Sequence, residues 1–311
     1  MGRLASKPRF GNTLGKREGP GSAPEPTPAA KDYDPPAMPA ATLSPPRPDP
    51  PVAERIDLTL PGLPEAMEGR TVLHVSDLHV RRYRPWFHRV ISLCSRVRPD
   101  FVCMTGDYMT LPRDEPAAMK VMQDLAAALR PRIGAYASFG NHDSEAFKRM
   151  AATIPGVVWL EHRAAVLTDF GVTFLGTSTP CDLIQTIVDA RDLERRLGVE
   201  GRSYRILLGH EPSILITCAE LGVEWALLGH THGGQVRPGL PIAFHNSSNL
   251  PLEHSSGILR CRDSVGTISR GLGESYFDVR LFCPPQLPLY VLRRGPLPGA
   301  FTRRMACVRW W

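Results

Sequence analysis

The chain has 311 residues, 42% of them hydrophobic, and a formal net charge of +6 at pH 7. No run of about 18 apolar residues occurs, which excludes a membrane-spanning helix, and the seven cysteines lack the spacing of a disulfide framework. The positive charge favours anionic partners, among them phosphate esters, nucleic acid and acidic lipid surfaces, without choosing between them.

Composition divides the chain into three segments. Residues 1–55 are rich in proline and poor in large apolar residues, which predicts a disordered arm. Residues 56–296 hold the apolar runs that a core needs, and we expect them to form one domain. Residues 297–311 form a basic tail.

Short β-rich stretches alternate with helical or loop segments, which predicts an α/β protein with layered sheets covered by helices. Five of these stretches end abruptly in polar residues: Thr71–Val75, Phe101–Met104, Ile133–Phe139, Tyr204–Leu208 and Val223–Leu228. Binding sites are often built where strands end and loops begin. We therefore expect the polar residues that follow to lie at a sheet edge and to face solvent.

The polar residues after the five strands form short clusters of metal-binding side chains. They are Asp77 and His79, Asp107, Asn141 and His142, His210, and finally His230 and His232. Such oxygen and nitrogen donors suit manganese, iron, zinc or cobalt rather than calcium. Two ions about 3.5–4 Å apart need an anion between them, and Asp107, alone after its strand, is the natural bridge.

In chain order the clusters read D-x-H, G-D, G-N-H-D, an isolated His and G-H-x-H. This set resembles the calcineurin-like metallophosphoesterase superfamily over roughly Val72 to Arg293. The resemblance implies a four-layer α/β/β/α sandwich of two mixed β-sheets flanked by helices. It also implies a hydrolase that acts on phosphoric ester or pyrophosphate bonds with two divalent metal ions.

The resemblance assigns a role to each clustered residue. One metal would be bound by Asp77, His79 and His232, and the other by Asn141, His210 and His230. Asp107 would bridge the two, and a metal-bound water or hydroxide would attack phosphorus in line. The catalytic His142 would contact the phosphate or protonate the leaving oxygen, with Asp143 orienting it.

After the last cluster, Val236–Cys261 is rich in proline and polar residues, which predicts a long loop beside the site. Strands at Val265–Ile268 and Leu289–Leu292 are expected to close the second sheet. Arg270 and Arg280 fit either a contact to substrate phosphate or an ion pair at the surface.

The segments Ile268–Gly273 and Arg280–Pro285 resemble the C-terminal signature of a bacterial phosphodiesterase branch of the superfamily. That branch includes enzymes of the UDP-2,3-diacylglucosamine pyrophosphatase type. The resemblance implies a phosphodiesterase or pyrophosphatase whose substrate is a nucleotide-sugar or a lipid-linked phosphoester. It also implies peripheral contact with a membrane.

Other functions share these ligands. A phosphomonoesterase or a nuclease would use the same site, so nucleic acid stays open as a partner. A catalytically silent scaffold that binds partners through its tails is a further alternative, although all seven expected ligands are present. The unpaired cysteine pattern and the lack of an apolar signal region at the N-terminus predict a cytoplasmic location.

Overall fold

The computed structural model describes residues 53–237, 243–275, 277–296 and 303–304. The predicted N-terminal arm and most of the basic tail lie outside these residues, so both stay predictions. The first strand, β1, begins at Ala53, three residues before the predicted domain boundary. Among the described residues, no helix has the length and apolarity to cross a membrane.

The first sheet has six strands and carries three of the predicted clusters. Its order is β1 (Ala53–Leu60), β12 (Leu287–Arg294), β2 (Thr71–Val75), β3 (Phe101–Thr105), β4 (Gly134–Ser138) and β5 (Val158–Trp159). From β2 to β5 the strands are parallel, whereas β12 runs antiparallel to β2. The carboxyl ends of β2, β3 and β4 therefore meet at one edge of the sheet.

The second sheet has seven strands and carries the remaining two clusters. Its order is β13 (Arg303–Arg304), β10 (Gly257–Cys261), β11 (Ser264–Ile268), β9 (Trp225–Leu228), β8 (Tyr204–Leu208), β7 (Val172–Gly176) and β6 (Arg163–Leu167). The strands β7, β8, β9 and β11 are parallel, while β6 pairs antiparallel with β7, and β10 pairs antiparallel with β11 and parallel with β13. Both sheets are therefore mixed.

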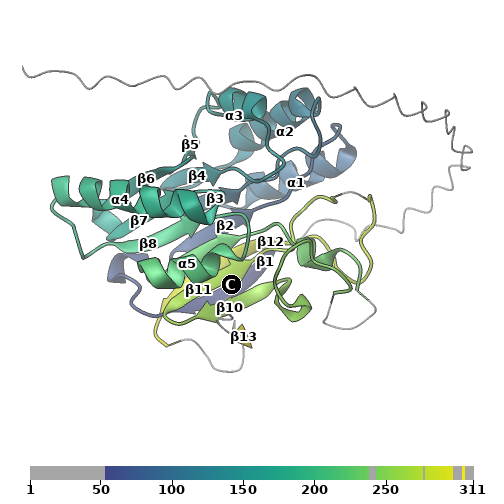
Figure 1. The fold of residues 1–311 in the computed structure, drawn as a ribbon. Helices are drawn as coiled ribbons and strands as arrows, with labels where there is room; N and C mark the ends of the chain where they lie inside the picture. Colours follow the sequence, from purple (N-terminus) through teal and green to yellow (C-terminus); the bar gives the residue numbers. More distant parts are fainter. Residues whose placement is uncertain (1–52, 238–242, 276, 297–302, 305–311) are drawn as a thin grey trace, which may run out of the picture. The chain divides into compact units, whose positions relative to one another are not determined.

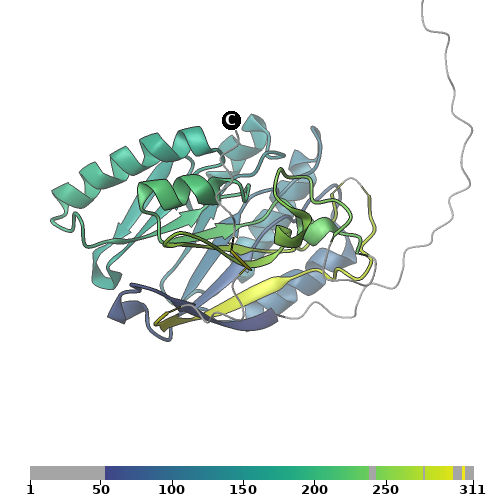
Figure 2. The ribbon, with the colours of Figure 1, turned by 60° about the horizontal axis from the view of Figure 1, so that its bottom comes forward.

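Helices cover the outer face of each sheet, as Figures 1 and 2 show. On the first sheet these are α1 (Pro85–Arg96), α2 (Glu115–Ala128) and α3 (Glu145–Ala151), and on the second α4 (Pro180–Arg196) and α5 (Ile214–Leu221). Short 3-10 helices lie at Glu65–Met67, Thr168–Phe170, His232–Gly234 and Leu252–His254. A separate apolar core fills the space between the sheets. The predicted four-layer α/β/β/α sandwich is confirmed.

Local sequence explains several of these elements. All five residues of β3 are buried, which is typical of a parallel strand covered on both faces. Pro85 begins α1, where its missing N–H is no loss, and the Ser144 hydroxyl caps α3 by accepting from Phe147 N. Gly222 ends α5 in the left-handed conformation.

Two sequence expectations need correction. Val265–Ile268 lies in the second sheet as expected, but Leu289–Leu292 belongs to the first, where Leu289 is opposite Leu73. The apolar pattern predicts the strand but not which strand it pairs with, because pairing depends on contacts between residues far apart in the sequence. The predicted loop Val236–Cys261 also ends earlier than expected, since Gly257–Cys261 is β10.

Candidate metal centre

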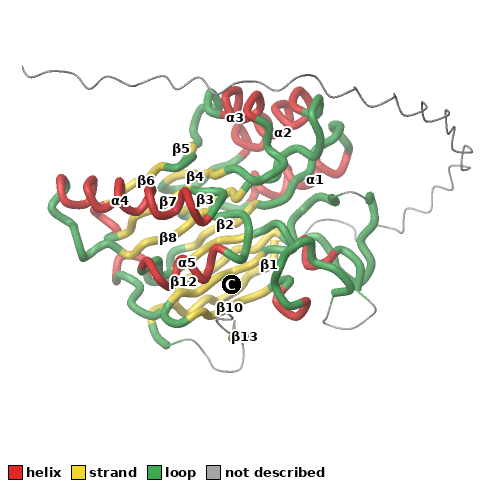
Figure 3. The backbone as a smooth tube through the Cα atoms, in the orientation of Figure 1, coloured by secondary structure: helices red, strands yellow, loops and turns green. Residues whose placement is uncertain are grey.

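The predicted ligands follow the carboxyl ends of five strands in the two sheets. Asp77 and His79 follow β2, Asp107 follows β3, and Asn141 follows β4. From the second sheet, His210 follows β8, and His230 and His232 follow β9. Long loops gather at this end of the strands, as Figure 3 shows. The site is thus assembled from both sheets.

The backbone is unusual at five of the predicted ligands. Residues with a side chain rarely adopt a positive φ, yet these five do: Asp77 (53°), His79 (45°), Asp107 (54°), His230 (70°) and His232 (52°). Such conformations cost free energy and cluster at functional sites, where the surrounding structure holds them. Gly229 shows how tight the packing is, because a Cβ there would lie 2.4 Å from the Asp77 carboxylate.

The first group of donors is Asp77, His79 and His232. The Nε2 atoms of His79 and His232 lie 3.0 Å apart, and His232 Nε2 lies 3.6 Å from Asp77 Oδ1. All three side chains are buried. The structure therefore brings together the three residues expected to bind one metal.

The second group of donors is Asp107, His210 and His230. His210 Nε2 lies 3.0 Å from Asp107 Oδ2, and His230 Nδ1 lies 3.0 Å from Asn141 Oδ1. Asn141 thereby joins the set, as expected for the other metal.

Asp107 lies between the two groups. Its Oδ2 is 3.0 Å from His210 Nε2 in one group and 3.4 Å from His79 Nε2 in the other. This placement matches the predicted role of Asp107 as the bridge, since a carboxylate between two cations lowers their repulsion.

The electrostatics of the centre favour a bound cation. Burial would raise the pKa of Asp107, but the neighbouring His210 and His79 outweigh it and hold that pKa well below the usual range. Burial would lower the pKa of His210, yet Asp107 raises it to about 10, which shows how strongly this carboxylate attracts positive charge. Burial, His79 and Arg280 lower the pKa of His232 well below its usual value, so its ring is neutral.

The hydrogen bonds also leave lone pairs directed into the centre. The Ser247 carbonyl can only accept, so the His230 Nε2 that faces it at 3.0 Å donates. A neutral His230 ring then has a bare Nδ1, which faces Asn141 Oδ1. On the other ring, His210 Nδ1 donates to Thr105 O at 2.7 Å, so Nε2 faces Asp107 and becomes a ligand when a metal ion displaces its proton. The donor set therefore fits divalent metal ions.

His142 and Asp143 play different parts from one another. The His142 ring is oriented by its Nδ1, which donates to Thr110 O at 2.8 Å, and its backbone N–H donates to Asp107 Oδ1 at 2.9 Å. The Asp143 carboxylate instead accepts from the backbone N–H groups of Asp107, Tyr108, Met109 and Gly140. Asp143 holds two site loops together, and the carbonyl of Thr110 orients the His142 ring that Asp143 was expected to orient.

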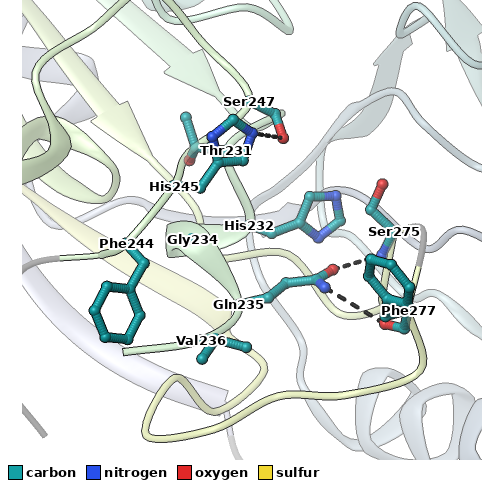
Figure 4. Close-up of a pocket in the computed structure, with 10 residues that line it drawn as sticks. All are labelled: Thr231, His232, Gly234, Gln235, Val236, Phe244, His245, Ser247, Ser275 and Phe277. Atoms are coloured by element: carbon teal, nitrogen blue, oxygen red, sulfur yellow. Dashed lines mark hydrogen bonds between the residues drawn. The ribbon is translucent and has the colours of Figure 1, made fainter. Parts of the chain in front are cut away.

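Sequence reasoning missed the walls of the cleft. A cavity of about 430 Å³ is lined by metal-centre residues together with His245, Ser247, Ser248, Asn249 and Ser275. A neighbouring cavity of about 420 Å³ is lined by Phe244 and Phe277 among others, which flank Gln235 in Figure 4. The expectation of a loop beside the site after Val236 pointed to part of this wall. Nothing in the sequence pattern indicated Ser275 and Phe277.

The two arginines singled out in the sequence have separate structural roles. Arg270 forms the expected ion pair, with its Nη2 3.3 Å from Glu54 Oε2. Arg280 is half-buried and donates to backbone carbonyls, among them those of His232 and Arg270. These bonds to the loop backbone differ from the surface ion pair that was one of its two expected roles.

Comparison with known proteins agrees with this site. The family model of the calcineurin-like phosphoesterases matches residues 70–234. An uncharacterized metallophosphoesterase of Bacillus subtilis, YkoQ, is 26% identical over 240 residues, covering 74% of this chain and 85% of its own. The phosphodiesterase YaeI of Escherichia coli is 27% identical over 234 residues, covering 71% and 81%.

A solved structure is similar at greater distance. The NAD nucleotidase NadN of Haemophilus influenzae has a TM-score of 0.41 and 14% identity, covering 65% of this chain and 50% of its own. The present chain thus spans about half the length of that protein. The family match covers the segment that carries all seven predicted ligands, and the chain belongs to the calcineurin-like phosphoesterase family of metal-dependent phosphoester hydrolases.

Proposed function

We propose that the protein is a phosphodiesterase with a binuclear metal centre, and that one substituent on its substrate phosphate is apolar. The observation that carries this proposal is the pair of adjoining cavities, which share four lining residues: His232, His245, Ser247 and Ser275. A monoester has one substituent on phosphorus, whereas a diester has two and needs room for both. The second cavity supplies that room.

The two cavities differ in chemistry. The cavity at the metal centre is lined by carboxylate, imidazole, amide and hydroxyl groups, which suit a phosphoryl group. The other contains Val236, Phe244 and Phe277, and the two phenylalanines are exposed. Exposed aromatic side chains beside a site suit an apolar ligand, because they lose contact with water when it binds. A lipid-linked or aryl phosphodiester fits this wall, and a nucleotide-sugar would place its base there.

The residues of the chain have distinct tasks in this proposal. Asp77, His79 and His232 would hold one cation, Asn141, His210 and His230 would hold the other, and Asp107 would be shared between them. When bound, the two cations would activate water and neutralise charge on the phosphoryl oxygens. His142, fixed by the Thr110 carbonyl, lies beside Asp107 and donates a proton or a hydrogen bond to the leaving oxygen.

The first test is a comparison of two chromogenic esters. After chelation, the full chain is reloaded with manganese, bound metal is measured by elemental analysis, and bis-p-nitrophenyl phosphate is assayed against p-nitrophenyl phosphate. About two metals per chain with faster diester cleavage supports the proposal. Faster monoester cleavage would identify a phosphomonoesterase, and bound metal without turnover on any ester would favour the scaffold function.

The apolar wall needs a separate test. Phe244→Ala and Phe277→Ala should each raise KM for bis-p-nitrophenyl phosphate about fivefold, which corresponds to roughly 1 kcal/mol of aromatic contact. Phe282→Ala is the matched control, because Phe282 is 68% exposed, close to the 67% of Phe244, and does not line the cavity. Equal effects of all three substitutions would contradict an apolar substrate contact. Cleavage of DNA or RNA in preference to the aryl diester would identify a nuclease.

The cellular setting is part of the same proposal. Cys94, Cys103, Cys218 and Cys283 are buried and carry free thiols. Free thiols are typical of a reducing compartment, which supports a cytoplasmic location. Peripheral contact with a membrane would follow from a lipid-linked substrate, since the exposed Phe244 and Phe277 lie at the cleft.

A further inference from the structure

A histidine that is no metal ligand lies buried beneath the metal centre. His74 belongs to β2, has no exposed surface, and lies on the same side of the strand as Val72, in the core between the sheets. Its ring centroid is 6.3 Å from that of Tyr290. Burial lowers the pKa of His74 to about 3, so the ring is neutral. A polar ring in an apolar core costs free energy unless it forms hydrogen bonds.

The hydrogen bonds of His74 lead to a predicted metal ligand. Its Nε2 is 2.8 Å from Thr105 Oγ1, which is 2.9 Å from Ser76 Oγ, which is 2.5 Å from Asp77 Oδ2. The four side chains come from β2, β3 and the loop after β2, and all are buried. They form one continuous chain from the inter-sheet core to the metal centre.

The direction of every bond in this chain is fixed by chemistry. Ser76 donates its single hydroxyl proton to Asp77 Oδ2, because a carboxylate oxygen accepts. Ser76 must then accept from Thr105, whose own proton is thereby used. Thr105 in turn must accept, and the donor is His74 Nε2–H. The chain therefore selects one tautomer of His74, in which Nδ1 carries no proton.

At the Asp77 end of this hydrogen-bond chain, the side chains are tightly held. Asp77 Oδ2 accepts from Ser76, while Asp77 Oδ1 accepts from the backbone N–H of His230 at 2.9 Å. A Cβ on Gly229 would lie 2.1 Å from Ser76 Oγ, so the backbone of that loop packs directly against the hydroxyl. Thr105 also binds the other half of the centre, because its carbonyl accepts from His210 Nδ1. The orientation of both ligands thus depends on the same residue.

We propose that His74 is a positioning residue for the metal centre, which acts through Thr105 and Ser76 to fix the orientation of the Asp77 carboxylate. Without the His74 donor, the Thr105 hydroxyl is free to turn its proton elsewhere, and Ser76 loses the bond that aims its own proton at Asp77. Groups behind a ligand typically change metal affinity by about 10–100-fold. The inference rests on the proposed ligand role of Asp77.

The test measures metal affinity directly, without turnover. Mn²⁺ dissociation constants are determined by equilibrium dialysis for the full chain and for His74→Leu, His74→Gln and Ser76→Ala. Leucine fills the space but cannot donate, whereas glutamine has an N–H donor. We expect about tenfold weaker binding for His74→Leu, at the low end of the range for outer groups, and near wild-type binding for His74→Gln.

A double-mutant cycle separates positioning from general disturbance. If His74 acts through Ser76, His74→Leu has no further effect on affinity once Ser76→Ala has cut the chain. The same tenfold loss in both backgrounds would overturn the proposal, and so would wild-type affinity in His74→Leu alone. A wild-type protein that binds no Mn²⁺ would instead overturn the metal centre itself.

Two further variants control for effects of the substitutions on folding. Thr105→Val keeps the shape of the side chain and removes its hydroxyl, which also breaks the hydrogen-bond chain. If His74→Leu fails to fold, the proposal requires Thr105→Val to weaken Mn²⁺ binding as much as Ser76→Ala does. Thr173→Val removes another buried hydroxyl, which lies on β7 of the second sheet and donates to Glu194 of α4. This control is expected to lower the melting temperature of the metal-free protein and to leave Mn²⁺ affinity unchanged. If Thr173→Val lost as much Mn²⁺ affinity as Thr105→Val, removal of any buried hydroxyl would weaken binding, and the proposed role of the hydrogen-bond chain would be contradicted.

Discussion

The guanidinium of Arg280 donates to the carbonyl oxygen of His232 at 3.3 Å, and its Nη2 also lies 3.4 Å from Nδ1 of the His232 ring. The same guanidinium donates to the carbonyls of Gly271, Gly273 and Cys283. One half-buried cation thus joins the loop after β9 to the loop before β12. A guanidinium has five N–H donors in a fixed planar fork, whereas the ammonium group of a lysine has three.

Arg280→Lys is therefore expected to destabilise the protein by roughly 3 kcal/mol, because several buried carbonyls lose their donor. Chemical denaturation of the metal-free chain measures the free energy of unfolding. Arg270→Lys is the control, since its ion pair with Glu54 is partly exposed and contributes at most about 1 kcal/mol. Similar losses in the two variants would contradict a special role for the Arg280 guanidinium.

Asp107→Asn should abolish turnover and weaken both metal sites. A neutral amide is a poor bridge between cations, and Asp107 Oδ2 lies between His79 and His210. The loss of metal affinity should exceed roughly 10–100-fold, the loss that is typical when a residue hydrogen-bonded to a metal ligand is replaced. Elemental analysis after gel filtration gives the metal content, and retained turnover in this variant would remove Asp107 from the centre.

His142→Ala should keep the metals and lower kcat by about 10²–10⁴-fold, the usual contribution of a general acid. The expectation follows from the proposed ligand assignment, in which His142 binds no metal although its ring lies close enough to His79 and Asp107 to form a third group of donors, and from the bond that holds this ring to Thr110 O. Metal content and kcat are measured on the same preparation. His88→Ala, an exposed histidine of α1, should change neither, and loss of metal from His142→Ala would make that residue a ligand.

Asp143→Asn should lower the free energy of unfolding by roughly 2–3 kcal/mol, because an amide nitrogen would face backbone N–H donors that now share a carboxylate. Both Asp143 oxygens accept, with Tyr108 N at 2.8 Å and Gly140 N at 2.8 Å. Asp114→Asn is the matched control, since that carboxylate accepts from the single N–H of Leu111. If Asp143→Asn and Asp114→Asn lowered the free energy of unfolding equally, the several backbone N–H bonds to Asp143 would add no more stability than the single bond to Asp114.

Much of the fold and site could be predicted from the sequence. Thr71–Val75 and Tyr204–Leu208 have the predicted bounds because their residues are apolar and their ends are marked by polar clusters. Leu289–Leu292 was assigned to the wrong sheet, since the choice between sheets depends on pairing with β1 and β2. The local sequence pattern predicts which residues form a strand, whereas contacts between distant segments decide where that strand lies in the sheets.

The same distinction explains the residues that were missed. Asp77 and His79 stand in a short motif, so residue type and spacing were enough to find them. The contacts of His74 and Arg280 were not predicted, because both form hydrogen bonds to residues distant in sequence and a lone histidine or arginine has no local signal. Phe277 reaches the cleft through a loop that pairs with the chain near Val236, a contact that no spacing rule describes.

Each proposed metal position draws ligands from both sheets, with Asp77 and His79 facing His232, and Asn141 facing His210 and His230. A bound ion would therefore act as a cross-link between the two halves of the sandwich. Neither half could assemble the centre by itself, and the ions would add a second link to that made by the shared core, which contains the stacked Tyr136 and Phe174. Metal loading would then stabilise both sheets together, because the ions bind only when the two are in place.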